Sequence, residues 1–525
     1  MSSPTIRHSP AATREATLVP EANPATAAQP GTEARRVSPA GRPARPARDR
    51  RNITLAVVLC AQLMIVLDLT VVNVALPSMA AGLHLSATGL SWVLNAYTLT
   101  FGGLLLLGGR AGDVFGRRTI FMAGLALFTL ASLAGGLATS PGILLAARAV
   151  QGVGGALASP AVLATIVASF PEGRERIRAL GAFTAVAMGG ASLGLVLGGM
   201  ITQWASWRWV FFINVPVGAV VIALTPRLLA RSHRLAAKLD VAGALASTAG
   251  MSALVYAFIN AASDGWSNRT TIGAFVAAVA LLGLFGVIET RAPEPITPLW
   301  LLRDRSRAAS YLARLLLVGG MFGMFFFLTQ FVQDVLGFSP LQAGLAFVPM
   351  TGALLTMSRL APRLVPRFGG KALLVAGLLP VVGGMAWLAQ VTPGTGYVPG
   401  ILVPMLLLGT GMGFAFVPLT MASLAGVPPQ DSGAAASMVN VMQQVGGALG
   451  LAILVTIYGS ARQAAARNPL PGASAVSEAR HVLVHGMALS FASAAIFDAV
   501  ALLVVIVAIR MVRPGASAQP AAAAE

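Results

Sequence analysis

Cysteine is nearly absent from the 525-residue chain, and Cys60 is its single occurrence. One cysteine forms no disulfide within the chain, and no cluster of cysteine and histidine at metal-ligand spacing accompanies it. Histidine is also rare and lies outside the apolar runs or near their ends, at His8, His84, His233, His481 and His485. The sequence therefore excludes a disulfide scaffold, and we expect neither a metal site nor a cofactor.

Charged residues are scarce as well, at 10% of the chain, whereas 56% of it is hydrophobic and its mean hydropathy is +0.77. A soluble protein carries about 25% charged residues. The apolar runs are twice the length of a membrane-barrel strand and lack its alternating pattern. Because backbone groups in lipid must pair internally, each run is predicted to be a helix. The sequence predicts an all-α polytopic membrane protein embedded in the lipid bilayer.

Acidic residues are half as frequent as basic ones, 18 against 36, which gives a net charge of +18. Nucleic-acid binding is excluded, because the arginines lie in loops between apolar runs and in the N-terminal tail. Loops on the side of the two termini are rich in Lys and Arg. The opposite loops carry only Arg208, Arg269, Arg462, Arg467 and Arg480. By the positive-inside rule, both termini are predicted to be cytoplasmic, in the plasma (inner) membrane of a bacterium.

Fourteen apolar runs are long enough to cross a bilayer. They cover approximately residues 53–77, 91–109, 119–138, 142–168, 179–202, 209–229, 240–262, 271–290, 308–331, 341–359, 372–391, 398–423, 433–458 and 486–510. The preceding stretch has no apolar core of a cleavable signal peptide, so we expect the first run to act as an uncleaved signal-anchor.

A faint internal repeat divides these runs into two halves. Gly109–Arg118 follows the second run and Pro362–Lys371 follows the tenth, and both are basic segments with Phe-Gly before the next helix. Duplicated halves are characteristic of secondary transporters. We therefore predict the following segments: a disordered basic cytoplasmic tail (1–52), a six-helix bundle (53–230), an inserted helix pair (231–305), a second six-helix bundle (306–512) and a disordered tail (513–525).

Asp68 lies about midway along the first run, where a carboxylate costs about 2.5–3.5 kcal/mol on insertion scales. Desolvation favours a neutral carboxylic acid, whereas a nearby guanidinium favours the carboxylate. Arg148, in the fourth run, is the candidate partner. We predict that this pair couples protons to transport; the alternative is a fixed ion pair that holds the bundle together. Asp498 is a candidate second protonation site, a polar group in helix packing, or a residue that faces a water-filled crevice. For Arg314, snorkelling to the cytoplasmic end of its run is a sufficient explanation.

Two glycine-containing segments suggest moving parts. The loop residues Gly109, Asp113, Gly116, Arg117 and Arg118 are predicted to form a conformational latch, with Asp113 capping a helix or pairing with Arg117. In the fifth run, Gly190, Gly194 and Gly198, with Gly199 beside them, form a face that lets another helix approach closely. Plain packing explains this second face equally well.

Several polar and large apolar side chains within the runs are candidates to line a cavity for amphipathic substrates, although each is equally compatible with interhelical packing. They are Asn73, Asn95, Tyr97, Gln151, Met188, Phe322, Phe326, Gln330, Asn440 and Gln443.

These segments together resemble the major facilitator superfamily, and within it the fourteen-helix drug:proton antiporters, the EmrB/QacA-like multidrug efflux transporters. Asp68–Pro77 resembles the first-helix signature and Gly109–Arg118 the loop motif between helices 2 and 3. Arg148–Gly154 resembles the helix-4 proton-coupling motif, Gly190–Gly199 the helix-5 antiporter motif, and Trp207–Pro216 the start of helix 6. The resemblance implies two six-helix bundles around a central cavity. It also implies transport by alternating access that the proton gradient drives.

The chain departs from the family pattern at four places. Leu195 stands where the helix-5 motif usually has proline, and Pro366 stands in the second half where the first has Asp113. In the loop motif, Val114 replaces a common basic residue and Gly112 a common alanine. The resemblance implies proton-coupled export of small lipophilic or cationic compounds such as antibiotics. A dedicated exporter of one metabolite, a membrane-embedded sensor or enzyme, and a passive channel are the alternatives. Nothing in the sequence sets the oligomeric state, and we expect a monomer.

Overall fold

The computed structural model describes residues 46–170, 174–229, 240–291, 299–427, 432–467 and 474–509, and these described residues contain helices and no strand. The predicted tails fall almost wholly outside the described residues. Helix α1 begins at Pro46, inside the segment predicted as tail. From Arg48 onward the chain forms one compact unit.

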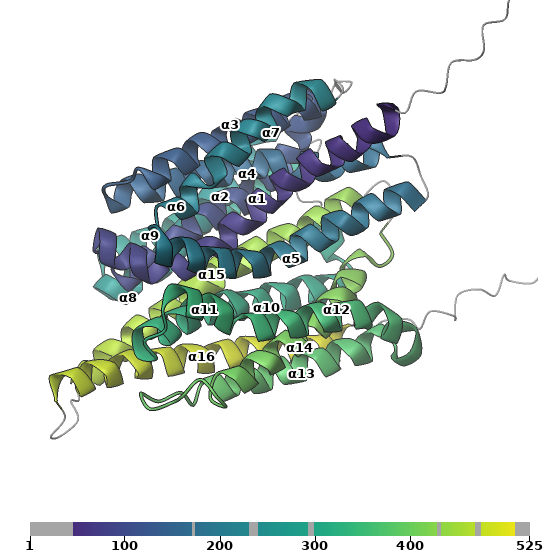
Figure 1. The fold of residues 1–525 in the computed structure, drawn as a ribbon. Helices are drawn as coiled ribbons and strands as arrows, with labels where there is room; N and C mark the ends of the chain where they lie inside the picture. The colour runs from purple at the N-terminus through teal and green to yellow at the C-terminus, as the bar shows by residue number, and fades with distance from the viewer. Residues whose placement is uncertain are drawn as a thin grey trace, which may run out of the picture. The chain divides into compact units, whose positions relative to one another are not determined.

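Each of the fourteen predicted runs falls on a helix or a pair of consecutive helices (Figure 1). The first half contains α1 (Pro46–Leu83), α2 (Ala87–Phe115), α3 (Arg117–Gly136), α4 (Pro141–Ser169), α5 (Arg174–Trp204), α6 (Trp209–Phe212) and α7 (Asn214–Leu228), followed by the pair α8 (Val241–Asp264) and α9 (Arg269–Arg291). The second half contains η1 (Leu299–Leu302), α10 (Arg305–Gln330), the π-helix η2 (Phe331–Val335), α11 (Pro340–Ala346), α12 (Val348–Phe368), α13 (Gly370–Leu388), α14 (Leu402–Leu424), α15 (Ser432–Arg467) and α16 (Ala475–Ala508).

Within the described residues, twelve helical stretches are long and apolar enough to cross a membrane. The fifth run supplies a shorter apolar stretch, Leu193–Trp204 in α5, and α2 is not among the twelve. Local signals begin several of these helices: Ser140 caps α4 just before Pro141, and Ser339 forms a capping box with Gln342 at the start of α11.

The two halves share a connection that the Phe-Gly repeat in the sequence predicts. Gly116 joins α2 to α3 at φ 96°, and Gly369 joins α12 to α13 at φ 84°, a conformation that glycine adopts without strain. Two residues later, a cation donates to a carbonyl at the end of the last helix of its half. Arg118 donates to Leu229 O at 3.2 Å, and Lys371 donates to Ile506 O at 2.7 Å. The repeat is therefore structural as well as sequential.

Equivalent glycines also bring equivalent helices together. A Cβ on Gly124 of α3 would meet Gly154 O and Ala158 N of α4, and a Cβ on Gly377 of α13 would meet Gly411 O and Ala415 N of α14. Close helix approach through small residues is the usual packing device in membranes. In an alignment of α4 with α14, Gly154 therefore corresponds to Gly411 and Ala158 to Ala415.

Helix α8 of the inserted pair contacts both halves. Thr248 of α8 packs against Gly103 of α2, and Thr456 Oγ1 of α15 donates to Phe258 O of α8 at 2.6 Å. Leu99, Val255 and Ala448 share one buried apolar cluster at this junction. Helix α8 is therefore packed against both α2 and α15.

The halves also meet at the end of the bundle where α5 finishes and α11 begins. A Cβ on Gly199 would overlap Pro340 O, one on Gly344 would overlap Leu195 O, and Gln203 Oε1 accepts from Leu341 N at 3.2 Å. Gln333 of η2 donates to Val74 O of α1 at 3.0 Å. Leu195, which replaces the usual proline of the helix-5 motif, thus lies in a contact between the halves, where its carbonyl oxygen faces Gly344.

Candidate functional site: a buried ion pair in the first half

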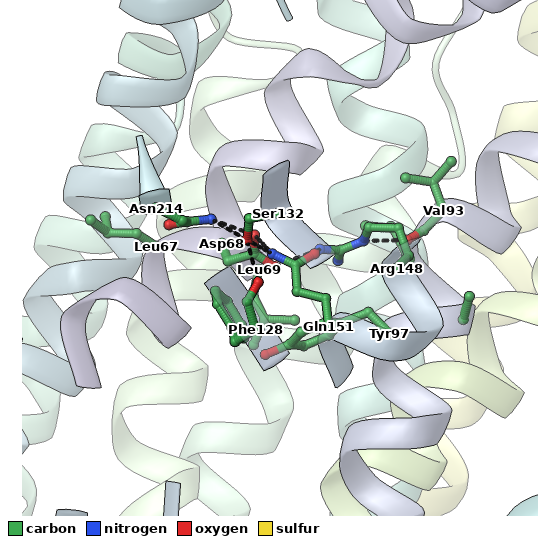
Figure 2. Close-up of polar contacts among 12 residues, drawn as sticks. Leu67, Asp68, Leu69, Val93, Tyr97, Phe128, Ser132, Arg148, Gln151 and Asn214 are labelled. Atoms are coloured by element: carbon green, nitrogen blue, oxygen red, sulfur yellow. Dashed lines mark hydrogen bonds and ion pairs between the residues drawn. The ribbon is translucent and has the colours of Figure 1, made fainter. Parts of the chain in front are cut away.

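Asp68 of α1 and Arg148 of α4 form an ion pair inside the first half (Figure 2). Arg148 Nη1 donates to Asp68 Oδ2 at 2.5 Å, and the two side chains are fully buried. Eighty residues separate them in sequence, so the packing of α1 against α4 creates the pair. The structure brings together the two residues predicted to couple protons, and that role stays a prediction.

The other carboxylate oxygen of Asp68 also faces hydrogen-bond donors. Gln151 Nε2 donates to Asp68 Oδ1 at 2.6 Å, and Asn214 Nδ2 donates to it at 3.1 Å. Ser132 of α3 accepts from both amides, at 2.8 Å from Gln151 and 3.3 Å from Asn214, and donates to Phe128 O. One hydrogen-bonded network around Asp68 therefore joins α1, α3, α4 and α7.

Arg148 is held on three further sides. Its Nε donates to Val93 O of α2 at 2.9 Å, its Nη1 also donates to Gln151 Oε1 at 2.7 Å, and its guanidinium lies 4.4 Å from the centre of the Tyr97 ring. Its Nη2 is buried without a partner. Arginine suits this position because its planar fork donates to several acceptors while stacking on an aromatic ring.

The segment after α5 places Asn214. Arg208 stacks on Trp207 at 4.4 Å and donates to Gly136 O at 3.3 Å and Ala138 O at 2.5 Å. These bonds satisfy carbonyls at the end of α3 and fix the short helix α6 beside it. Helix α7 then begins at Asn214, whose side chain points to Asp68.

The protonation state of Asp68 affects the strength of the hydrogen bonds that it accepts from Arg148, Gln151 and Asn214. The three side chains bonded to Asp68 all donate, and an ionised carboxylate accepts from each of them through charge-assisted bonds. A proton on either oxygen would remove the negative charge and convert one acceptor lone pair into an O–H donor. Protonation would therefore weaken these hydrogen bonds and the attraction of Arg148.

The described residues of the second half form no equivalent network at the positions that correspond to Arg148 and Gln151. In the alignment through Gly154 and Gly411, Arg148 corresponds to Met405 and Gln151 to Leu408. Both are buried hydrophobic side chains. Helices α4 and α14 thus share their glycine packing contacts, whereas the ion pair is formed by α4 of the first half.

Asp498 of α16 is fully buried, and neither of its carboxylate oxygens has a hydrogen-bond partner. It lies against Gly320 of α10, where an added Cβ would be 3.2 Å from Oδ1. The snorkelling interpretation of Arg314 is wrong, because the residue is only 3% exposed and its Nη2 donates to Thr420 Oγ1 of α14 at 2.6 Å. Both residues of the second half are thus buried ionisable side chains that form no ion pair among the described residues.

The predicted latch residues lie at the junction of α2 and α3. Gly109 lies near the end of α2, Gly116 forms the turn, and Arg118 donates to the end of α7. Arg117 begins α3. The backbone of Asp113 belongs to α2, and its side chain lies outside the described residues. The latch function stays a prediction.

The glycines of α5 face two neighbours. Gly190 lies against Leu63 and Val66 of α1, and Gly194 and Gly198 lie against Thr70 and Val71 of the same helix. Gly199 instead faces α11 of the second half. The face therefore brings α5 against the helix that carries Asp68, and one residue further on it contributes to the contact between halves.

We expect Gly194→Val to lower the free energy of unfolding by about 1–3 kcal/mol, because the new side chain would overlap Thr70 Oγ1 in a packed contact. The matched control is Gly283→Val in α9, where no atom lies within 4 Å of an added Cβ. Thermal unfolding in detergent, followed by size-exclusion chromatography, measures both. Equal transition temperatures would contradict the packing role.

The candidate cavity residues are dispersed. Tyr97 and Gln151 belong to the ion-pair network, Gln330 donates to Phe326 O, Asn73 donates to Leu69 O, and Asn95 is buried with neither amide atom bonded. Phe326 is buried against Phe327, Phe322 packs on Gly447, Asn440 is exposed and Gln443 is partly buried. The side chain of Met188 lies outside the described residues. Their role as a cavity lining stays a prediction.

Two members of the network, Ser132 and Asn214, are absent from the sequence-based site. Asn214 lies within the Trp207–Pro216 segment, which did signal a special structure. Ser132 gives no such signal, because a serine in an apolar helix usually bonds to its own backbone, as its bond to Phe128 O also shows.

Two helical halves with a common architecture are typical of secondary membrane transporters, and buried carboxylates within membrane helices commonly mark their ion pathways. The chain belongs to the Major Facilitator Superfamily, which matches residues 58–451. It is 45% identical over 413 residues to the puromycin resistance protein pur8 of Streptomyces alboniger, covering 78% of this chain and 82% of that one. It is 41% identical over 413 residues to the cephamycin export protein CmcT of Amycolatopsis lactamdurans, covering 78% and 85%.

Solved structures show the same fold. A bacterial homologue of the human lysosomal transporter Spinster superposes with a TM-score of 0.66 at 14% identity, covering 89% of this chain and 98% of that one. At this identity the similarity concerns the fold alone. The solved structure confirms the predicted all-α fold, and the family match over residues 58–451 confirms the predicted superfamily.

Proposed function

We propose that the chain is a proton-coupled antiporter that exports small lipophilic or cationic compounds, with Asp68 carrying the proton. The observation that carries the proposal is the carboxylate of Asp68, which is buried and surrounded by the donors Arg148, Gln151 and Asn214. A group whose protonation weakens hydrogen bonds among four helices is suited to couple a proton to a conformational change.

Export of drugs is supported by the relatives. One is described as a puromycin resistance protein, another as a cephamycin export protein, and a third, the multidrug resistance protein Stp of Mycobacterium tuberculosis, is 33% identical over 432 residues. These descriptions favour an exporter over a sensor, an enzyme or a channel. We further propose that the chain belongs to the fourteen-helix drug:proton antiporters, with α8 and α9 as the inserted pair and both termini cytoplasmic.

The coupling cycle follows from the geometry of the ion pair. In the state with Asp68 ionised, Arg148 and Gln151 hold α1 against α4. A proton arriving at Asp68 removes the charge that strengthens these bonds, so α1 and α4 are held together less strongly and can repack against α5 and α2. Loss of the proton restores the donor-surrounded carboxylate and the original packing.

Efflux from everted membrane vesicles tests the proposal. Vesicles containing the protein are energised and given a panel of fluorescent dyes and antibiotics, with and without a protonophore. We expect accumulation of substrate inside the vesicles that the protonophore abolishes. Accumulation that persists with the protonophore, or that requires ATP, would overturn proton coupling.

Asp498 is proposed as a second protonation site, because a buried carboxyl group without a partner is stable only when neutral. We expect Asp498→Asn to keep proton-driven efflux through Asp68 while moving fewer protons for each substrate. The proton-to-substrate ratio, measured in proteoliposomes from the voltage at which net flux stops, reports this. An unchanged ratio would reduce Asp498 to a packing group.

A further inference from the structure

Arg314 presents a buried positive charge that no described carboxylate neutralises. Its guanidinium donates once, to Thr420 Oγ1, and lies 5.6 Å from the ring centre of Phe416 on the same helix α14. Its Nε is buried and has no partner. Asp498, the buried carboxylate of the same half, bonds to nothing, so it does not serve as the missing partner.

The contrast with Arg148 shows what is missing. Arg148 bonds to a carboxylate, an amide oxygen and a backbone carbonyl, and it lies closer to its aromatic ring, at 4.4 Å. Arg314 has a hydroxyl and a more distant ring. Burying a cation is unfavourable unless it is paired and fully hydrogen-bonded. The protein alone therefore leaves the position of Arg314 incomplete.

A second buried cation strengthens the positive potential around Arg314. Arg307 lies seven residues earlier, on the same face of α10 and about 10 Å along its axis. It donates to Ala425 O at 3.1 Å and lies 5.4 Å from the Trp300 ring centre, and it is 5% exposed. The nearby Asp304 uses its Oδ1 to cap α10 by accepting from Arg307 N, and no carboxylate among the described residues forms an ion pair with the Arg307 guanidinium.

Three hydroxyl groups lie near the two arginines. Tyr311 OH donates to Ser423 O at 3.3 Å, and the hydroxyls of Ser423 and Ser310 lie 3.2 Å apart. Guanidinium and hydroxyl groups together are the chemistry that binds phosphate and carboxylate oxygens. We propose that Arg314 and Thr420, assisted by Arg307, form a binding site for an oxyanion between α10 and α14.

Two sources supply such a group: a phospholipid headgroup from the bilayer, or a free anion such as inorganic phosphate. The purified full chain, in a neutral detergent stripped of lipid, is titrated in separate arms with phosphatidylglycerol and with inorganic phosphate. Phosphatidylcholine, which carries phosphate without net charge, is the comparison lipid. Binding is read from the thermal transition temperature and, for lipid, from the mass of the intact complex.

We expect one anion to raise the transition temperature of the wild type by several degrees and to have at least tenfold less effect on Arg314→Gln. The Arg307→Gln variant should show a smaller loss, and the control Arg462→Gln, which removes a cation stacked on Tyr458, should respond like the wild type. A response to phosphatidylglycerol alone identifies a headgroup, and a response to phosphate identifies a free anion.

The proposal is overturned if neither anion stabilises the wild type, or if Arg314→Gln keeps the full response. If Arg314→Gln does not fold, Arg314→Lys replaces it. The lysine keeps the charge and loses the planar fork, so the expected result is a weaker response to the same anion. These readouts need no transport, so they stand apart from the test of the proposed function.

Discussion

Asp68→Asn is expected to abolish proton-driven efflux while the protein remains in the membrane. The amide has the size of the carboxylate and carries no titratable proton, so the proposed protonation step is lost. The everted-vesicle assay should show accumulation at the level of vesicles without the protein. Membrane abundance, measured with a C-terminal fluorescent fusion, should stay within about twofold of wild type.

A matched control removes another acid from the same helical framework. Asp334→Asn replaces an exposed carboxylate in η2, away from the Asp68 network, and should leave accumulation unchanged. Downhill substrate flux without a proton gradient should survive in Asp68→Asn. If Asp68→Asn still concentrates substrate against its gradient, Asp68 does not carry the coupled proton.

Arg148→Ala is expected to have the largest effect on stability, because it leaves the Asp68 carboxylate buried without its counter-charge. Removal of one partner of a buried pair costs about 3–5 kcal/mol. The variant also empties the space between Val93 O and the Tyr97 ring. Its thermal transition temperature in detergent should fall well below that of the wild type, and proton-coupled efflux should be absent.

The double variant Asp68→Asn/Arg148→Ala separates charge from packing. Because it contains no unpaired buried charge at this position, it should be more stable than Arg148→Ala alone, a non-additive result expected for directly interacting residues. Efflux should remain absent. Additive losses of stability would show that the two side chains act independently, contrary to the ion pair.

The helices could be predicted from the sequence because lipid imposes a simple rule. An apolar run such as 271–290 must form a helix, and α9 covers Arg269–Arg291. The rule says little about ends and breaks. Residues 209–229 form the consecutive helices α6 and α7, and the end of α10 continues as the π-helix Phe331–Val335.

The site was only partly predictable, because its contacts depend on packing between distant segments. Asp68 and Arg148 stand out in sequence, since charge in an apolar run is costly. Ser132 and Asn214 carry no charge and no spacing signal, so their place in the network depends on how α3 and α7 pack. For Arg314, the sequence predicted a solvent-accessible side chain that the structure instead buries. Its position near the end of a run suggested a route to the surface, whereas α14 covers it.

The neutrality of the Asp68–Arg148 pair has an electrical consequence. With Asp68 ionised, the pair carries no net charge, so a movement of both side chains through part of the membrane does no work against the membrane voltage. With a proton on Asp68, the same pair carries one positive charge, worth about 2.3 kcal/mol per 100 mV for a full crossing. In the proposed cycle, a voltage that is negative inside would therefore favour movement of the proton-loaded pair toward the cytoplasm, whereas the pair without the proton would move without electrical work.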